Sequence, residues 1–202
     1  MPTEKTRRTQ AERKDEAERR MLEAGVRLAA ERGLERITLN DVGEAAGYSR
    51  GLPAHHFGTK QAFRERLVAF LGREFRGGLG ASRAEPGLAG LEQMLLGVFA
   101  RARRDALFVC VVRIVLADRP GRPGPPGGVK AMRDVALAAI ERHLRAGLRR
   151  GEIRRGTSVR LAGRVLAAAA CGVLELGLAD ASVDVERAGR QLVALLVAGL
   201  RG

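Results

Sequence analysis

The chain is poor in aromatic residues, which make up 3% of its 202 residues, and it has one tyrosine and no tryptophan. Large flat rings are the groups that stack on planar ligands and on aromatic cations. Few such surfaces can therefore form, and the composition favours an aliphatic or mixed ligand over an aromatic cation.

Cysteine is scarce as well, since Cys110 and Cys171 are isolated from each other and neither stands at a cysteine–histidine spacing typical of metal sites. We therefore expect neither a disulfide nor a zinc site, and no metal or other cofactor. By eye, long apolar runs are also missing: we find no stretch as long as the about 18 apolar residues of a membrane span. The N-terminal segment MPTEKTRRTQ has no apolar core like that of a signal peptide. These absences predict a soluble, cytoplasmic protein without a membrane partner.

Basic residues are abundant, with 36 Lys and Arg against 23 Asp and Glu and a net charge of +13. The excess lies mostly in residues 71–202, which carry net +10, whereas residues 1–70 carry net +3. Such charge supports affinity for polyanions in general but does not locate a binding site. Because Arg outnumbers Lys 32 to 4, compositional bias is an equally good explanation for most surface arginines.

One segment carries a clear pattern, residues 38–60, TLNDVGEAAGYSRGLPAHHFGTK. Thr38 and Asp41 form a variant of the capping box, and Leu39, Val42, Ala45 and Ala46 follow at helical spacing. Gly47 is suited to end this helix, because glycine readily takes the left-handed conformation just past a helix end. Two short helices joined by Gly47, Tyr48 and Ser49 make a helix-turn-helix, a unit that places a helix in the major groove of DNA.

The second helix of this unit is expected to be capped by Ser49 and to run through His56. Pro53 lacks an amide proton and disfavours helical angles at Leu52, so we expect it in the first turn of a helix that starts late or is irregular. The adjacent His55 and His56 point about a hundred degrees apart on a helix and are therefore not expected to share a metal ion.

This segment, the following HHF and the GTK that opens a further helix resemble the DNA-binding domain of the tetracycline-repressor (TetR) family of bacterial regulators over about residues 15–72. The segment AGLRRGEIR at residues 146–154 is similar to the turn before the family's last two helices. The resemblance implies that Arg50 reads a base in the major groove, with a phosphate contact as the alternative, and that Lys60 anchors the DNA backbone. We expect the following residues to contact DNA: Thr38, Tyr48, Ser49, Arg50, Gly51, Ala54, His55, His56, Thr59 and Lys60.

The predicted fold is all-α, with a three-helix helix-turn-helix domain and a C-terminal helical domain. Residues 1–10 form a basic arm that either follows the DNA backbone or is disordered. Residues 11–72 form the DNA-binding domain, and residues 73–202 bind an effector and dimerise. Segment 106–118 is apolar almost all round, so periodicity alone does not separate helix from strand there, and the family resemblance favours helix. Residues 119–128, RPGRPGPPGG, predict a loop.

The C-terminal half is expected to hold an aliphatic cavity with few polar groups. Its candidate lining residues are Met94, Phe99, Phe108, Cys110, Arg113, Met132, His143, Cys171 and Glu175, although a stripe of such residues is more often plain core. Arg113, His143 and Glu175 interrupt apolar surroundings, so each either pairs within the protein or faces a ligand, which is anionic if Arg113 points inward. The last two helices, at about 158–179 and 184–201, carry apolar faces and small residues and are expected to pair with a second copy.

We therefore expect a homodimeric regulator, acting as a repressor, that binds a palindromic double-stranded operator and is released by a small molecule. Two other classes stay open. A ligand-independent architectural DNA-binding protein would suit the high charge. An enzyme using His143, Glu175 or a cysteine is disfavoured, because no catalytic residues, phosphate loop or metal motif stand at a recognisable spacing.

Overall fold

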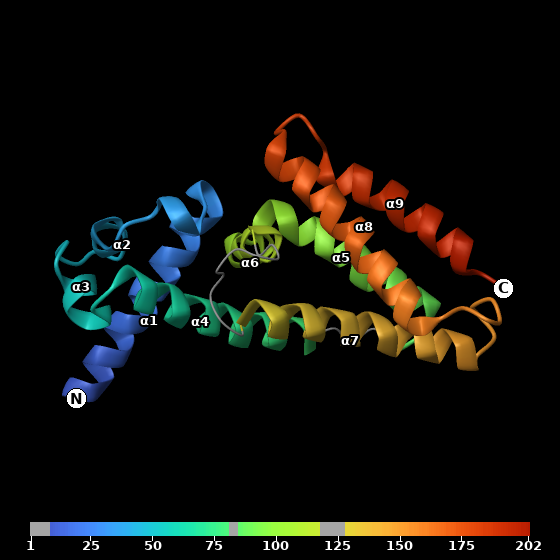
Figure 1. Ribbon diagram of the computed structural model, residues 1–202, viewed down its shortest axis with the longest axis horizontal. Helices are drawn as coiled ribbons and strands as arrows, with labels where there is room; N and C mark the ends of the chain where they lie inside the picture. The colour runs from blue at the N-terminus through green and yellow to red at the C-terminus, as the bar shows by residue number, and fades with distance from the viewer. Residues whose placement is uncertain (1–8, 81–84, 118–127) are drawn as a thin grey trace, which may run out of the picture. The chain divides into compact units, whose positions relative to one another are not determined.

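The computed structural model describes residues 9–80, 85–117 and 128–202, with no description of the side chains of residues 76–80. This part of the chain is all-α, as the sequence predicts (Figure 1). Its elements are α1 (Gln10–Arg32), the 3-10 turn η1 (Leu34–Arg36), α2 (Leu39–Ala45), α3 (Leu52–Phe57), α4 (Lys60–Gly80), α5 (Leu88–Arg104), α6 (Ala106–Ala117), α7 (Gly128–Arg149), α8 (Val159–Ala179) and α9 (Val185–Leu200). The predicted loop at 119–128 lies outside the described residues except for Gly128, which opens α7.

The chain divides into two compact units, residues 1–70 and residues 71–202, so α4 begins in the first and ends in the second. In the first unit, Thr9 caps α1 in a capping box with Glu12, and Gly33 ends the helix with a φ of 82°. The predicted inner face of α1 is buried as expected, at Met21, Leu22, Gly25, Leu28 and Ala29. On α4, Phe63 and Leu67 are buried. A Cβ on Gly25 would lie 2.5 Å from the Phe63 ring, so this glycine lets α4 pack closely on α1.

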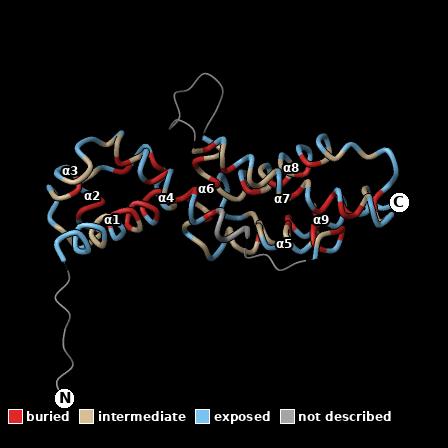
Figure 2. Tube along the Cα trace, turned by 90° about the horizontal axis from the view of Figure 1, so that it is seen from below, coloured by how far each residue is buried: buried red, intermediate tan, exposed pale blue. Residues whose placement is uncertain are grey.

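In the second unit, α5 packs mainly against α9, and α7 packs mainly against α8. Figure 2 shows buried segments recurring along the helices with exposed segments between them, as amphipathic helices require. Phe99 of α5 packs on α9, where a Cβ on Gly189 would lie 2.2 Å from its ring. The apolar segment 106–117 forms α6, which resolves the ambiguity between helix and strand in favour of helix.

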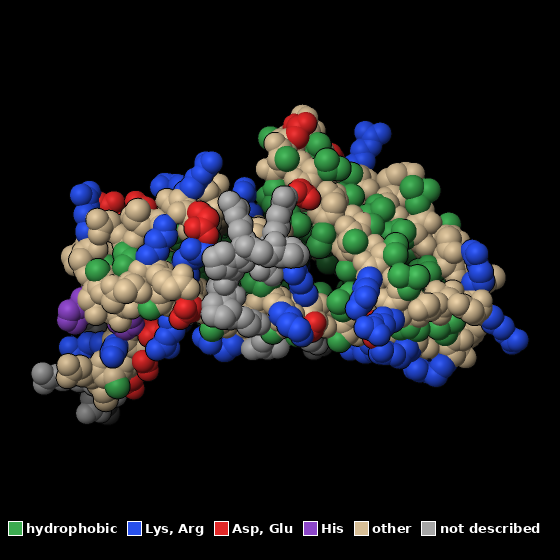
Figure 3. Space-filling view, viewed as in Figure 1, with side chains coloured by type: hydrophobic (Ala, Val, Ile, Leu, Met, Phe, Trp, Pro, Cys, Tyr) green, Lys and Arg blue, Asp and Glu red, His purple; other side chains and the backbone are tan. Residues whose placement is uncertain are grey.

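Helix α8 corrects one expectation from the sequence. Its 21 residues are long and apolar enough, by length and composition only, to cross a membrane, whereas we expected no such stretch. A core helix of a soluble protein passes the same test of length and composition. Many residues of α8 are alanine and glycine. Only 22% of its most apolar window is buried in this chain. Figure 3 shows hydrophobic side chains over this exposed face, and the large exposed ones are Leu161, Val165 and Leu176 of α8 and Leu195 of α9.

Candidate DNA-binding surface and effector cavity

Helix α2 ends as the sequence predicts. Gly47 has a φ of 76°, its amide donates to the carbonyl of Glu44 at 3.0 Å, and the Tyr48 amide donates to the carbonyl of Gly43 at 2.9 Å. These two bonds form a Schellman motif, which satisfies carbonyl groups at the end of a helix and reverses the chain. At the other end, the hydroxyl of Thr38 accepts from the Asp41 amide at 3.2 Å and the Asp41 carboxylate accepts from the Thr38 amide at 2.8 Å. Both ends of α2 are therefore defined by local bonds.

Helix α3 begins later than a cap at Ser49 would place it. Ser49 is not its cap, because residues 49–51 form a turn in which the Leu52 amide donates to the Ser49 carbonyl at 3.1 Å. Gly51 occupies the cap position, and Pro53 lies in the first turn, where no helical amide bond is lost. This confirms that Pro53 delays the start of the helix.

Gly43 is a site residue that the sequence interpretation missed. A Cβ at this position would lie 2.6 Å from the Ser49 carbonyl oxygen and 3.2 Å from Cα of Arg50. The turn into α3 therefore packs directly on the backbone of α2. A glycine inside a short predicted helix, where it lowers stability, is the signal that pointed to such a close approach.

The first residues of α3 and the preceding turn form the exposed part of the candidate DNA-binding surface. Arg50 forms an ion pair with Glu44 of α2 and its side chain is 72% exposed. Ser49, Gly51, Ala54 and His55 are also exposed, and Tyr48 is half-buried. Arg50 is therefore positioned by a carboxylate that a competing anion can replace.

His56 lies elsewhere than expected. Its Nε2 lies 2.9 Å from the carboxylate of Glu18 on α1, and its side chain is only 10% exposed. Its ring also makes an edge contact with Phe57, which in turn packs edge-on against Phe63 with centroids 5.1 Å apart. His56 thus joins α3 to α1, and this pairing leaves little of its side chain exposed for a contact with DNA.

Thr59 and Lys60 open α4. The Thr59 hydroxyl accepts from the Ala62 amide at 3.1 Å, so Thr59 caps the helix. The Lys60 ammonium donates to the backbone carbonyl of Glu35 at 2.7 Å. An ammonium at a helix start, held by a neutral carbonyl, keeps its full charge for a phosphate.

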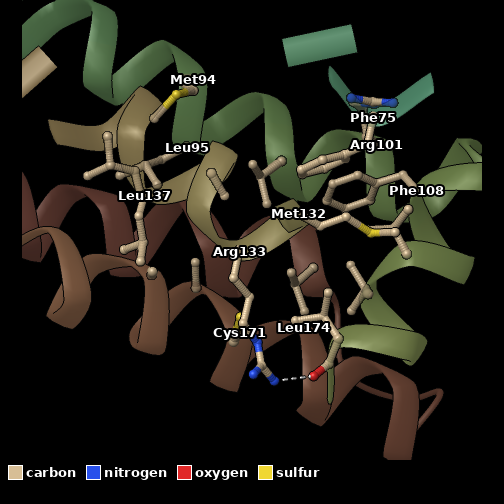
Figure 4. Close-up of a pocket in the computed structure, with 18 of the residues that line it drawn as sticks. Phe75, Met94, Leu95, Arg101, Phe108, Met132, Arg133, Leu137, Cys171 and Leu174 are labelled. Carbon is tan, nitrogen blue, oxygen red and sulfur yellow. Dashed lines mark hydrogen bonds between the residues drawn. The ribbon is translucent and has the colours of Figure 1, made fainter. Parts of the chain in front are cut away.

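The second unit holds a cavity of about 550 Å³. It lies between α5, α6, α7 and α8, with Phe75 of α4 at its edge (Figure 4). This volume falls within the range of ligand sites, about 300 to 1,000 Å³. Of the nine residues proposed from the sequence, four line this cavity: Met94, Phe108, Met132 and Cys171.

The other five lie away from it. Phe99 packs on α9, Cys110 is fully buried in the core, and Glu175 is exposed on α8. On α6 the lining residues recur as one helical stripe, at positions 108, 111, 112, 115 and 116, so Cys110 and Arg113 lie on other faces. The Nε atom of Arg113 is buried without a hydrogen-bond partner, and it does not line the cavity. The anionic ligand that we expected Arg113 to bind therefore has no support from that residue.

His143 lies on the inner face of α7 but is not a lining residue. It is fully buried, and its Nδ1 accepts a long hydrogen bond, 3.4 Å, from the amide of Gly87. Its pKa is lowered from the ordinary 6.5, first by burial and then by Arg142, so the ring is neutral. A Cβ on Gly90 would lie 2.7 Å from its Cε1, which shows how closely α5 and α7 approach here.

Both cysteines are poor nucleophiles, because burial raises the pKa of Cys110 to about 12 and also raises that of Cys171. Among the described residues, no group of three or more His, Cys, Asp or Glu is placed to hold a metal ion. The sequence interpretation missed the polar residues that do line the cavity: Gln93, Arg101, Arg133 and Arg164. No sequence signal singles out these arginines among 36 basic residues.

Comparison with known proteins gives a family match, a curated relative and similar solved structures. Residues 21–67 match the family model described as bacterial regulatory proteins, tetR family. The HTH-type transcriptional regulator CymR of Pseudomonas putida is 44% identical over 54 residues, which span 27% of this chain and 27% of CymR. The chain thus matches about a quarter of the length of this curated relative.

Two solved structures share the fold over nearly the whole chain. SmeT, the repressor of the Stenotrophomonas maltophilia multidrug efflux pump SmeDEF, is 24% identical with a TM-score of 0.71, over 92% of this chain and 90% of SmeT. The transcriptional regulator FadR from Bacillus subtilis, solved in complex with stearoyl-CoA, is 19% identical with a TM-score of 0.72, over 91% of this chain and 99% of FadR.

Proposed function

We propose that this chain, a member of the TetR family of bacterial regulatory proteins by its N-terminal domain, is a cytoplasmic transcriptional repressor that binds a palindromic operator as a homodimer. A small molecule in the cavity of the second unit releases it from DNA. The family assigns regulation of transcription rather than catalysis. The observation that carries the proposal is the exposed start of α3, with Arg50 on a turn that Gly43 and Gly47 hold against α2.

Contacts to bases and to phosphates have different roles in this proposal. Arg50 is the base reader, because its guanidinium is exposed and can donate two hydrogen bonds to guanine. Lys60 contacts a phosphate, and Thr38, Tyr48, Ser49, Gly51, Ala54, His55 and Thr59 supply further contacts to the backbone or to bases. A symmetric dimer must present its two α3 helices about 34 to 36 Å apart to reach successive major grooves.

Helix α4 offers a direct connection between DNA binding and ligand binding. It carries Lys60 at its first residue and Phe75, a residue of the cavity wall, 15 residues later. A ligand that favours a different spacing of the two DNA-binding domains lowers DNA affinity by its differential affinity for the two states.

Related proteins support a ligand-responsive repressor. SmeT is described as the repressor of a multidrug efflux pump and has also been solved with triclosan, and FadR was solved with stearoyl-CoA. The competing function is an architectural DNA-binding protein, which the net charge of +10 in residues 71–202 would suit. An architectural protein has no use for a cavity of about 550 Å³.

Gel-shift titrations at several salt concentrations test the proposal. The protein is expected to prefer one near-palindromic duplex over random DNA. Arg50→Ala should weaken binding by about 1 to 3 kcal/mol and relax preference at one symmetric base position. Lys60→Ala should weaken all sequences alike and lower the salt slope by roughly one per contact. Equal affinity for specific and random duplexes would contradict the proposal and favour the architectural function.

A further inference from the structure

The charges on the cavity wall have one sign. Among the residues that the structure describes, its lining includes three arginines, Arg101, Arg133 and Arg164, and no Asp, Glu, Lys or His. Nearly all other lining residues are aliphatic, and the aromatic rings are those of Phe75 and Phe108. A cationic ligand therefore meets only like charge among the lining residues.

These polar groups are separated from the apolar ones. Gln93, Arg133 and Arg164 are exposed residues, whereas Phe108, Met132 and Leu174 are buried. Figure 4 shows the Arg133 side chain extending along the cavity past Cys171. The cavity thus has a polar mouth that carries positive charge and an apolar interior, an arrangement complementary to a molecule with one charged end.

The three arginines differ in what they already bind. Arg101 bonds the carboxylate of Asp105 and lies over the Phe108 ring at 5.0 Å. The pKa of Asp105 is lowered on balance: burial would raise it, but the Phe108 amide and Arg101 outweigh that effect, so Asp105 offsets the charge of Arg101. Arg133 donates to the backbone carbonyl of Val115 at 2.7 Å.

Arg164 makes no hydrogen bond or ion pair with any residue that the structure describes. It lies on α8, and the lining residues Ala167, Ala168 and Cys171 follow it on the same side of that helix. Its guanidinium is therefore the cation at the mouth with the most donor capacity left for a ligand, and a guanidinium binds a carboxylate or phosphate through two parallel hydrogen bonds.

We propose that the cavity binds a single-chain anionic amphiphile, with the acid group at the mouth beside Arg164 and Arg133 and the alkyl chain among the apolar residues inside. A long-chain carboxylate supplies this acid group as its carboxylate, and a long-chain coenzyme A thioester supplies it as the phosphates of coenzyme A. Binding follows from the cavity alone, and only the effect of the ligand on DNA rests on the proposed function. The specificity resides in charge, because a neutral chain gains the same apolar burial without the bond to arginine.

The test titrates the full-length protein with three probes of equal chain length: dodecanoate and dodecyltrimethylammonium below their micelle concentrations, and dodecanol below its solubility limit. Isothermal titration is expected to give dodecanoate an affinity at least about tenfold higher than that of dodecanol, and no measurable binding of the cation. Dodecanoyl-CoA, titrated alongside, distinguishes the two sources of the acid group. Tighter binding of the thioester points to an acyl-CoA, and tighter binding of the free acid points to a fatty acid.

The variants assign the acid group to its partner. Arg164→Gln should lower dodecanoate affinity about tenfold and leave dodecanol affinity unchanged, and Arg133→Gln should act in the same direction. Arg160→Gln is the matched control, since Arg160 is exposed on the same helix and does not line the cavity. If Arg160→Gln lowered dodecanoate affinity as much as Arg164→Gln, the binding would reflect general attraction of an anion to a basic protein, and the proposal would be overturned.

DNA binding separates the two proposals. If dodecanoate binds in an Arg164-dependent manner but does not release DNA, the ligand class stands and the repressor mechanism fails. If dodecanol or the cation binds more tightly than dodecanoate and releases DNA, the repressor mechanism stands and the anionic class is wrong.

Discussion

Glu18 and His56 are 38 residues apart in the chain, yet a carboxylate oxygen of Glu18 lies 2.9 Å from Nε2 of His56. The contact ties α3, the helix proposed to enter DNA, to the middle of α1. Because the His56 side chain is 10% exposed, water cannot readily replace the lost partner if either side chain is removed.

Glu18→Ala is therefore expected to lower the free energy of unfolding of the N-terminal domain by about 1 to 2 kcal/mol. It should also weaken binding to all DNA sequences alike, because it displaces α3 without touching bases. Urea denaturation and gel shifts measure the two effects. Glu23→Ala is the control, since Glu23 pairs with Arg19 on the exposed side of α1, and it should change stability by less than about 0.5 kcal/mol. A similar loss in both variants would show that the bond to His56 has no special role.

Gly43 and Gly51 give a second matched pair. Gly43→Ala places a Cβ 2.6 Å from the Ser49 carbonyl oxygen, so the turn must move, and stability should fall by about 1 to 3 kcal/mol. Gly51→Ala meets nothing within 4 Å, and Gly51 already has helical angles. It should therefore leave stability unchanged or raise it by about 0.4 to 1 kcal/mol. Thermal denaturation distinguishes the two, and an unaffected Gly43→Ala would mean that the approach of the turn to α2 is not required.

Leu195 tests the dimer proposed through α8 and α9. Of the two leucines considered from the sequence, Leu192 is half-buried within the chain, whereas Leu195 is 63% exposed. Leu195→Arg should place an unpaired charge in the interface, raise the dimer dissociation constant at least about tenfold and reduce operator affinity. Ala138→Arg adds the same charge on an exposed position of α7 and should leave the dimer intact. Sedimentation of the unmodified protein as a monomer at micromolar concentration would contradict the dimer itself.

His143 predicts a dependence of stability on pH. Its folded pKa lies below the ordinary 6.5, so below that pH the unfolded chain binds a proton that the folded chain resists. The neutral His143 ring therefore makes its full contribution to the free energy of unfolding above about pH 6.5, and this contribution is lost as the pH falls toward the folded pKa. The melting temperature should therefore decline as the pH falls below about 6.5, and His143→Gln should flatten that decline.

His55→Gln serves as the control, because His55 is exposed, and this variant should retain the decline of the original protein. The decline assigned to His143 begins at a higher pH than the loss of charge on Asp41, Asp105 and Asp184, since the pKa of each of these carboxyl groups is lowered from 3.8. An unchanged slope in His143→Gln would assign the acid sensitivity to another group.

Much of the DNA-binding domain follows from the sequence, because its signals are local. The Thr38 cap, the glycine at 47 and the proline at 53 act on residues within three or four positions, whatever the rest of the chain does. Apolar spacing likewise identified the inner face of α1. These features determined an all-α chain with a helix-turn-helix.

The tertiary structure decided which polar side chains line the cavity. Arg113 was the conspicuous charge in an apolar run, yet it lies off the stripe of α6 that lines the cavity, while Arg133 and Arg164 line the cavity from α7 and α8. His56 shows the same limit, since its partner Glu18 comes from a distant helix. Helical periodicity determines which residues share a face, but the rotation of each helix about its axis depends on packing against helices far away in the chain. That rotation is a property of the packed core, and it separates a charge that lines the cavity from one that only interrupts an apolar sequence.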